Sequence, residues 1–100
     1  MSAERDLQHK AVKSLRDAGF VVQVFSQHRR VMRQVANFPD AIAFKDSRTF
    51  LLEFKAPGAK LRPGQEEFRA DVLPECGEHL QHHVIDDLLQ VAALISEYGG

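Results

Sequence analysis

The segment between residues 40 and 55 constrains the fold of this 100-residue chain more than any other. Residues 40–45 and 49–55 each carry apolar side chains on both faces of a predicted strand, and the turn-prone pair Asp46-Ser47 separates them. Two such runs around a short polar turn predict a β-hairpin. A strand that is apolar on both faces is normally covered on both. We therefore expect the hairpin to lie in a sheet with helices against it.

The remaining sequence supplies those helices and two further strands. Periodicity, glycines and prolines predict helices at 3–18, 63–74 and 86–97, and strands at 20–26, 40–45, 49–55 and 82–85. The last helix is expected to have Asp86 as its N-cap and to face inward with four side chains: Leu88, Leu89, Ala92 and Ile95. The order predicts one α/β domain over residues 1–100, with a central mixed sheet flanked by helices.

The hairpin also brings charged residues together. A two-residue loop pairs Lys45 with Arg48, and in that register Asp40 lies opposite Glu53. Side chains directly opposite each other have Cβ atoms about 4.5–5.5 Å apart. Because strand side chains alternate with period two, Lys55 projects to the same face as Glu53. We expect these three ionisable groups to converge at one end of the hairpin.

This convergence predicts a metal site with hydrolytic chemistry. Two carboxylates in an apolar setting repel each other and cost several kcal/mol to desolvate unless a cation lies between them. Oxygen ligands without His or Cys favour a hard ion, Mg²⁺ or Mn²⁺. Lys55 would then activate a water molecule or neutralise charge on a phosphate. The alternative is that Asp40 caps a loop while Glu53 and Lys55 form a solvated pair.

Charge and composition bear on the partner and the compartment. Residues 1–62 have a balance of +6 and residues 63–100 a balance of −7, which suggests one face for a polyanion, although the acidic residues can also be ordinary solvated helix surface. The single cysteine cannot form an internal disulfide. No apolar run approaches the roughly 20 residues of a membrane span, and the N-terminus lacks a signal-peptide layout, so we expect a cytoplasmic protein. Five basic residues flank the hairpin and are candidates for DNA binding: Arg29, Arg30, Arg33, Lys60 and Arg62.

The same residues resemble a known nuclease signature. Pro39-Asp40, followed 13 residues later by Glu53-Phe54-Lys55, resembles the PD-(D/E)xK pattern, and residues 56–65 are similar to the continuation found in the VRR-NUC family. The resemblance covers nearly the whole chain. It implies a restriction-endonuclease-like αβββαβα core related to Holliday junction resolvases. It also implies a structure-selective, metal-dependent endonuclease that acts as a homodimer on branched DNA such as Holliday junctions or flaps, in bacteria or phage-infected cells.

The resemblance assigns roles to individual positions. By position it implies the metal ligands Asp40, Glu53 and the backbone carbonyl of Phe54, the catalytic Lys55, and Gln65 as a helix residue that reaches toward the site. Glu4 matches an extra acid that many relatives place above the metal, although it can equally be a helix N-terminal carboxylate favoured by the dipole. The chain departs from its relatives at Phe38, where they commonly have glycine.

Two functions other than catalysis also remain compatible with the sequence. One is a DNA-binding module that has the fold without catalysis. The other is a partner module in a phage or bacterial DNA-processing complex, in which Asp40 and Glu53 are structural. Binding of a divalent metal ion separates the nuclease from the partner module.

Overall fold

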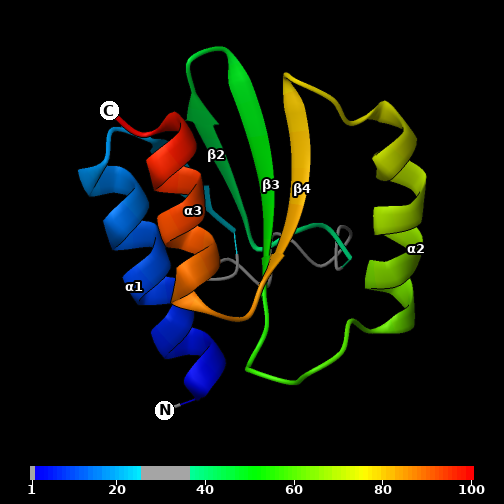
Figure 1. Cartoon of the computed structure of the whole chain (residues 1–100). Coiled ribbons are helices and arrows are strands. Elements are labelled where there is room, and N and C mark those ends of the chain that lie inside the picture. Colours follow the sequence, from blue (N-terminus) through cyan, green and yellow to red (C-terminus); the bar gives the residue numbers. More distant parts are fainter. Residues whose placement is uncertain (1, 26–36) are drawn as a thin grey trace.

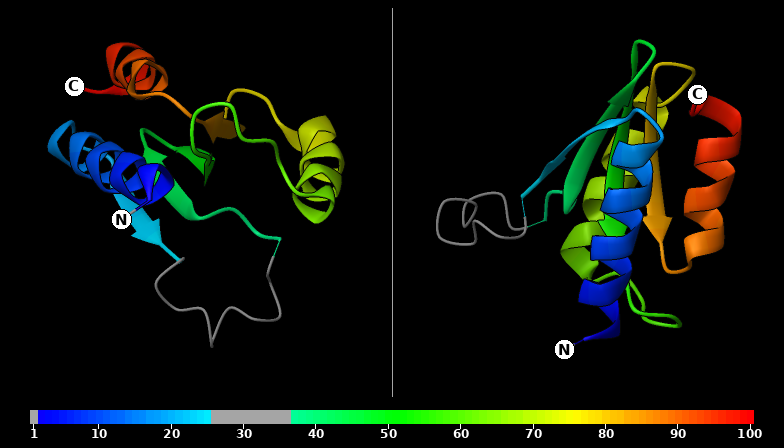
Figure 2. Two further views of the ribbon diagram at one scale, coloured as in Figure 1. Left: turned by 90° about the horizontal axis from the view of Figure 1, so that it is seen from below. Right: turned by 90° about the vertical axis from the view of Figure 1, so that its left-hand side faces the viewer.

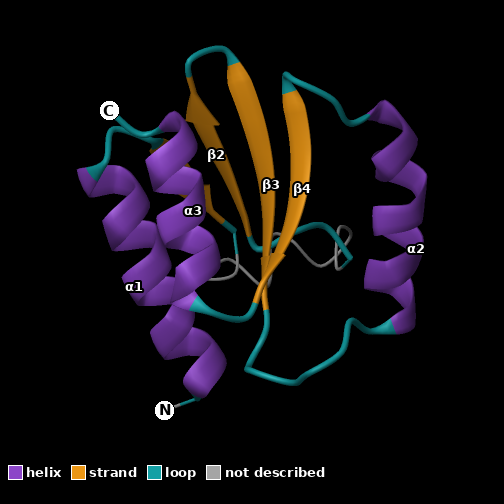
Figure 3. Ribbon diagram, in the orientation of Figure 1, coloured by secondary structure: helices purple, strands orange, loops and turns teal. Residues whose placement is uncertain are grey.

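The structure, a computed structural model, describes residues 2–25 and 37–100 and contains one four-stranded sheet flanked by helices (Figures 1 and 3). The elements are α1 (Ala3–Asp17), β1 (Val21–Val24), β2 (Ala41–Lys45), β3 (Arg48–Phe54), α2 (Pro63–Val72), a 3₁₀ turn (Leu73–Glu75), β4 (Leu80–Ile85) and α3 (Leu88–Tyr98). α1 and α3 lie side by side on one face of the sheet, while α2 lies on the other face beside β4 (Figure 2). The predicted α/β class with a mixed sheet is confirmed, and so is the predicted order of helices and strands.

The sheet combines an antiparallel meander with one parallel pair. The strand order is β1-β2-β3-β4, with β1, β2 and β3 antiparallel and β4 parallel to β3. The parallel pair needs a crossover, and α2 provides it. In the hairpin, Lys45 pairs with Arg48, which is the predicted register. Asp46 and Ser47 both have positive φ, 49° and 66°, as a tight two-residue hairpin turn requires.

The main core lies between the sheet and the α1–α3 layer. Phe50, Leu52 and Phe54 alternate along β3 toward this layer, and all three are fully buried. Leu15 from α1 and Val91 from α3 meet them there. β3 is buried from Phe50 to Phe54 without a break, so the prediction that this strand is covered on both faces is confirmed.

The start of α3 differs from the prediction. Its N-cap is Asp87, whose side chain accepts a hydrogen bond from the Leu89 N–H at 2.7 Å, and not Asp86. The inward face was also predicted wrongly in part. Leu88 and Leu89 are 39% and 77% exposed and Ala92 is exposed, whereas Val91 and Leu94 are buried and Ile95 is partly buried. Residues 88–95 are apolar on every side except at Gln90, so periodicity alone could not choose the buried face.

Side chains and one turn cap the outer carbonyls of both edge strands. On β1, the Arg16 guanidinium donates to the Val22 carbonyl at 2.8 Å, and the Gln23 amide donates to the Val24 carbonyl at 3.3 Å. On β4, three successive outward carbonyls accept from three donors: Leu80 from the Gly77 N–H, His82 from Arg69 and Val84 from Gln90. Such capping blunts edges that could otherwise pair with another strand.

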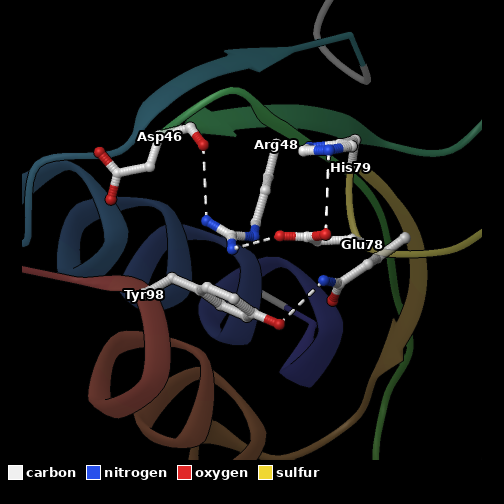
Figure 4. A network of polar contacts seen from close by, with 6 residues as sticks. Asp46, Arg48, Glu78, His79 and Tyr98 are labelled. Carbon is white, nitrogen blue, oxygen red and sulfur yellow. Dashed lines mark hydrogen bonds and ion pairs between the residues drawn. The ribbon is translucent and has the colours of Figure 1, made fainter.

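A polar cluster ties the hairpin turn to the end of α3 (Figure 4). The Arg48 guanidinium lies 4.9 Å from the centre of the Tyr98 ring and donates to Glu78 Oε1 and to the Asp46 carbonyl, both at 3.4 Å. The Tyr98 hydroxyl accepts from the Gln81 amide at 3.0 Å. These contacts hold the end of the sheet that lies far from Asp40 and Glu53.

All three helices begin at the same end of the molecule, where β3 and β4 finish (Figure 1). Loop 55–62 leaves β3 at this end and leads into α2. Within the described residues, no helix has both the length and the apolar character needed to cross a membrane.

Candidate active site

Asp40 and Glu53 face each other where the β2–β3 hairpin opens. The last paired residues at this end are Ala41 and Leu52, and the next position on each strand is Asp40 or Glu53. In this register their side chains lie on the same face of the hairpin, directly opposite each other. The juxtaposition expected from the hairpin register is therefore present in the structure.

The Asp40 carboxylate is oriented by the backbone of β3. Its Oδ2 accepts a hydrogen bond from the Phe54 N–H at 2.9 Å. In the hairpin register Phe54 would face Pro39, but β2 begins only at Ala41. The ladder stops there, and the Asp40 side chain takes an N–H that would otherwise lack a partner. This bond fixes one oxygen of the Asp40 carboxylate. It also brings Phe54, whose carbonyl is the third predicted ligand, next to the pair.

Glu53 is buried, with 3% of its surface exposed, and its protonation reflects that burial. Burial, together with the hydrogen bond and negative charge of Asp40, raises the pKa of Glu53 to about 9, while the charges of Lys55 and Arg62 oppose the shift. Without a cation, Glu53 holds a proton at neutral pH. A positive ion between the two carboxyl groups would replace that proton.

Lys55 and Arg62 bring positive charge near the carboxyl group of Glu53. Both act on Glu53 electrostatically, although Lys55 directly follows β3 and Arg62 comes seven residues later, at the start of α2. The Lys55 N–H donates to the Ile85 carbonyl at 2.9 Å, which extends the β3–β4 ladder and holds the Lys55 backbone. Lys55 is half-buried and Arg62 is exposed. One lysine thus lies close to the pair, and one arginine lies where solvent and a large ligand can reach it.

Gln65 connects to the site through the start of α2. Only 6% of its surface is exposed, and its Oε1 accepts from the Arg62 N–H at 2.9 Å. Its oxygen therefore anchors the residue that caps the helix. The structure places Gln65 beside Arg62, and its predicted contact with the reacting groups stays a prediction.

The remaining predicted site residues are Glu4, Lys60 and three arginines. In the part of the chain that the structure describes, no group of three or more His, Cys, Asp or Glu side chains is placed to hold a metal ion, so Glu4 does not complete a three-acid site. Glu4 lies in the first turn of α1, where the helix dipole favours a carboxylate. Lys60 is exposed in the loop before α2. Three predicted DNA-binding residues lie outside the described residues: Arg29, Arg30 and Arg33.

The two adjacent histidines of β4, His82 and His83, make packing and hydrogen-bond contacts within the fold. They point to opposite faces of the sheet, with His82 near the Phe68 ring and His83 near the Phe50 ring. His82 Nδ1 lies 2.8 Å from the Arg69 guanidinium, which must donate. Burial lowers the pKa of His82 to about 4, and the Arg69 charge contributes to that shift. His82 is therefore neutral and joins α2 to β4.

Two residues close to the site received no role from the sequence: Phe38, which was noted only as a departure from the relatives, and Gly64. The Phe38 ring lies between the rings of Phe25 and Phe68. A Cβ at Gly64 would overlap the side-chain amide of Asn37. The only sequence signal for these contacts was an aromatic residue just before Pro39-Asp40, and it did not reveal which partners α2 would bring.

Comparisons with known proteins did not identify a family, since no protein-family model matches the sequence and no curated protein is significantly similar to it.

Proposed function

We propose that this chain is a divalent-metal-dependent nuclease that hydrolyses phosphodiester bonds in DNA. The observation that carries the proposal is the buried Glu53 carboxyl group facing Asp40 under the positive charges of Lys55 and Arg62. A buried carboxyl group that faces a second carboxyl group is costly in a fold that does not use it. Perturbed ionisable groups with specific charged neighbours are common at functional sites.

The donor set fits Mg²⁺ or Mn²⁺. Asp40, Glu53 and the Phe54 carbonyl offer oxygen atoms, and the Phe54 N–H orients the Asp40 carboxylate by donating to its Oδ2. Mg²⁺ usually takes one or two carboxylates and keeps several waters, so two acids and a carbonyl are sufficient. The ion supplies charge for a phosphate oxygen and lowers the pKa of a bound water molecule.

The remaining residues have roles in binding and proton transfer. Lys55, half-buried beside Glu53, would hold a water molecule and neutralise charge that develops on the phosphate. Arg62 and Lys60, both exposed before α2, would bind phosphates on either side of the scissile bond. Gln65 supports Arg62 through the helix cap.

The resemblance to the VRR-NUC branch of the PD-(D/E)xK nucleases supports the finer parts of the proposal. The order of elements and the mixed sheet are compatible with a restriction-endonuclease-like core. On this basis we propose branched DNA, such as Holliday junctions or flaps, as the substrate. We also propose a homodimer, because two related active sites can address two strands of a branched substrate, and a cytoplasmic location in a bacterial or phage-infected cell.

Cleavage of labelled DNA tests the proposal directly. The native protein is incubated with a four-way junction, a flap, a single strand and a plain duplex, each with Mg²⁺, with Mn²⁺ or with EDTA. We expect metal-dependent cleavage that Asp40→Ala and Lys55→Ala each reduce by about 100-fold or more. The matched controls are Asp71→Ala and Lys13→Ala, which remove the same side chains at exposed positions on α2 and α1.

The results separate the nuclease from its alternatives. Cleavage that survives both substitutions would show that another site, or a contaminant, does the chemistry. Junction binding without cleavage or metal binding would favour the non-catalytic DNA-binding module. If the protein binds neither metal nor DNA, Asp40 and Glu53 are structural, as expected for a partner module.

A further inference from the structure

The segment that carries Asp40 is held by aromatic contacts just before that residue. The Phe38 ring lies 5.8 Å from the Phe25 ring and 5.5 Å from the Phe68 ring, with interplanar angles of 74° and 61°. Both are edge-to-face arrangements, which aromatic side chains favour. Phe25 directly follows β1 and Phe68 belongs to α2, so Phe38 joins two elements that lie far apart in the sequence.

Residues on either side of Phe38 fix the segment further. Asn37 lies against Gly64, where there is no room for a Cβ. Pro39 is fully buried. The Asp40 carboxylate then accepts from the Phe54 N–H. The chain from Phe38 to Asp40 is thus held at each residue, by ring contacts, by burial or by a hydrogen bond.

The same contacts hold α2. Phe68 lies 6.1 Å from the His82 ring, and the neighbouring Arg69 donates to His82. The inner side of α2 is therefore attached to β4 at one point and to the Asp40 segment at another. Because Arg62 and Gln65 are at the start of α2, the position of this helix decides where the Arg62 charge lies relative to Glu53.

We propose that Phe38 is a positioning residue that couples α2 to Asp40. Through its contacts with Phe25 and Phe68, it holds the Asp40 carboxylate on the Phe54 N–H and keeps Arg62 beside the carboxyl pair. The consequence for catalysis rests on the proposed nuclease function, but the placement of Asp40 does not.

Amide hydrogen exchange tests this placement without requiring activity. In Phe38→Ala, the Phe54 amide is expected to exchange about tenfold faster than in the native protein, because its acceptor moves away. The Leu52 amide serves as the internal reference, since Leu52 pairs with Ala41 inside the ladder and reports the stability of the whole sheet. The matched control is Phe44→Ala, which removes the same ring from β2 at a side chain that is 44% exposed.

Metal affinity and kinetics supply the functional readout. We expect Phe38→Ala to weaken Mn²⁺ binding and to lower kcat by about tenfold with a smaller change in KM, because the metal ligand is misplaced while the outer DNA contacts stay. Phe38→Leu, which keeps much of the apolar volume, is expected to restore part of each loss. Should the alanine variant not fold, Phe38→Leu against Phe44→Leu supplies the same comparison with a smaller change in the same direction.

The outcomes are distinguishable. If the exchange rates of the Phe54 and Leu52 amides change by the same factor in every Phe38 variant, Phe38 contributes only to general stability and the proposal is wrong. If the native protein neither binds Mn²⁺ nor cuts DNA, the nuclease proposal fails, whereas the ratio of exchange rates at Phe54 and Leu52 still decides the role of Phe38.

Discussion

At the scale of single residues, the Glu53 proton makes folding depend on pH. Burial and Asp40 raise the pKa of Glu53 from 4.5 to about 9, so the folded chain binds this proton more tightly than the unfolded chain. The stabilisation that results is present in full below pH 4.5 and is lost as the pH rises toward about 9.

This dependence can be measured by urea denaturation in the presence of EDTA. We expect the free energy of unfolding of the native protein to fall between about pH 5 and about pH 9, and Glu53→Gln, which cannot ionise, to show a much flatter profile. Glu67→Gln is the control, since Glu67 is exposed on α2. Equal slopes for the native protein and Glu53→Gln would show that other groups cause the pH dependence.

Single residues also show which contacts of the candidate site could be predicted from the sequence. The juxtaposition of Asp40 and Glu53 could be predicted, because a two-residue turn fixes the register of a hairpin. The bond from Phe54 to Asp40 could not, because it depends on where the β2 ladder stops. The effect of Arg62 on Glu53 depends on how α2 packs, and the local sequence pattern does not contain that information.

At the scale of elements, α3 depends on a cap at Asp87. The Asp87 side chain accepts from the Leu89 N–H, and the Gln90 side chain accepts from the Asp87 N–H at 3.0 Å. Reciprocal capping of this kind satisfies donors that the first turn leaves unpaired. We expect Asp87→Ala to lower the free energy of unfolding by about 1 kcal/mol, as measured by chemical denaturation.

The control for this prediction is the preceding residue. Asp86→Ala removes the same side chain one position earlier, where the Gln90 contact uses only the backbone N–H of Asp86. Its effect is expected to stay within about 0.5 kcal/mol. If both variants lose the same stability, loss of negative charge near the helix start, rather than the cap, is responsible.

Secondary structure was more predictable than the face that each element buries. α1 could be oriented from sequence because Leu7, Ala11 and Leu15 form a single apolar stripe, and all three are buried. In α3, apolar residues surround the helix, and the choice of Val91 and Leu94 follows from the packing of the whole domain. Sequence patterns determine the buried face only where polar residues mark the opposite one.

At the scale of the whole molecule, the capped strand edges limit how two copies can meet. The Arg16 guanidinium occupies the Val22 carbonyl, which points away from β2. We expect Arg16→Ala to increase association at high concentration, because it frees an acceptor on an edge strand. Sedimentation velocity over a range of concentrations measures the change.

The control for the edge is Lys13→Ala, which removes one positive charge from the same helix, at a side chain that pairs with exposed Asp17. Equal association of both variants would show that net charge, and not the freed carbonyl, drives it. With the edges capped, the proposed homodimer would form through helices or through the sheet face that α2 leaves open, where Val21 and Phe44 are 65% and 44% exposed.

The common direction of the three helices has a consequence for how a polyanion would approach. Each helix start carries roughly half a positive elementary charge. Acidic residues offset it in the first turn of α1, at Glu4 and Asp6, and at the Asp87 cap of α3. The cap of α2 is Arg62, which adds to it, although Glu66 lies in the same first turn. Among the three helix starts, that of α2 is therefore the one with a cation at its cap, in a chain of net charge −1, and the field of this charge reaches about 8 Å at physiological ionic strength. Under the proposed function, this field would turn an approaching DNA toward α2 and Lys55 before any contact forms.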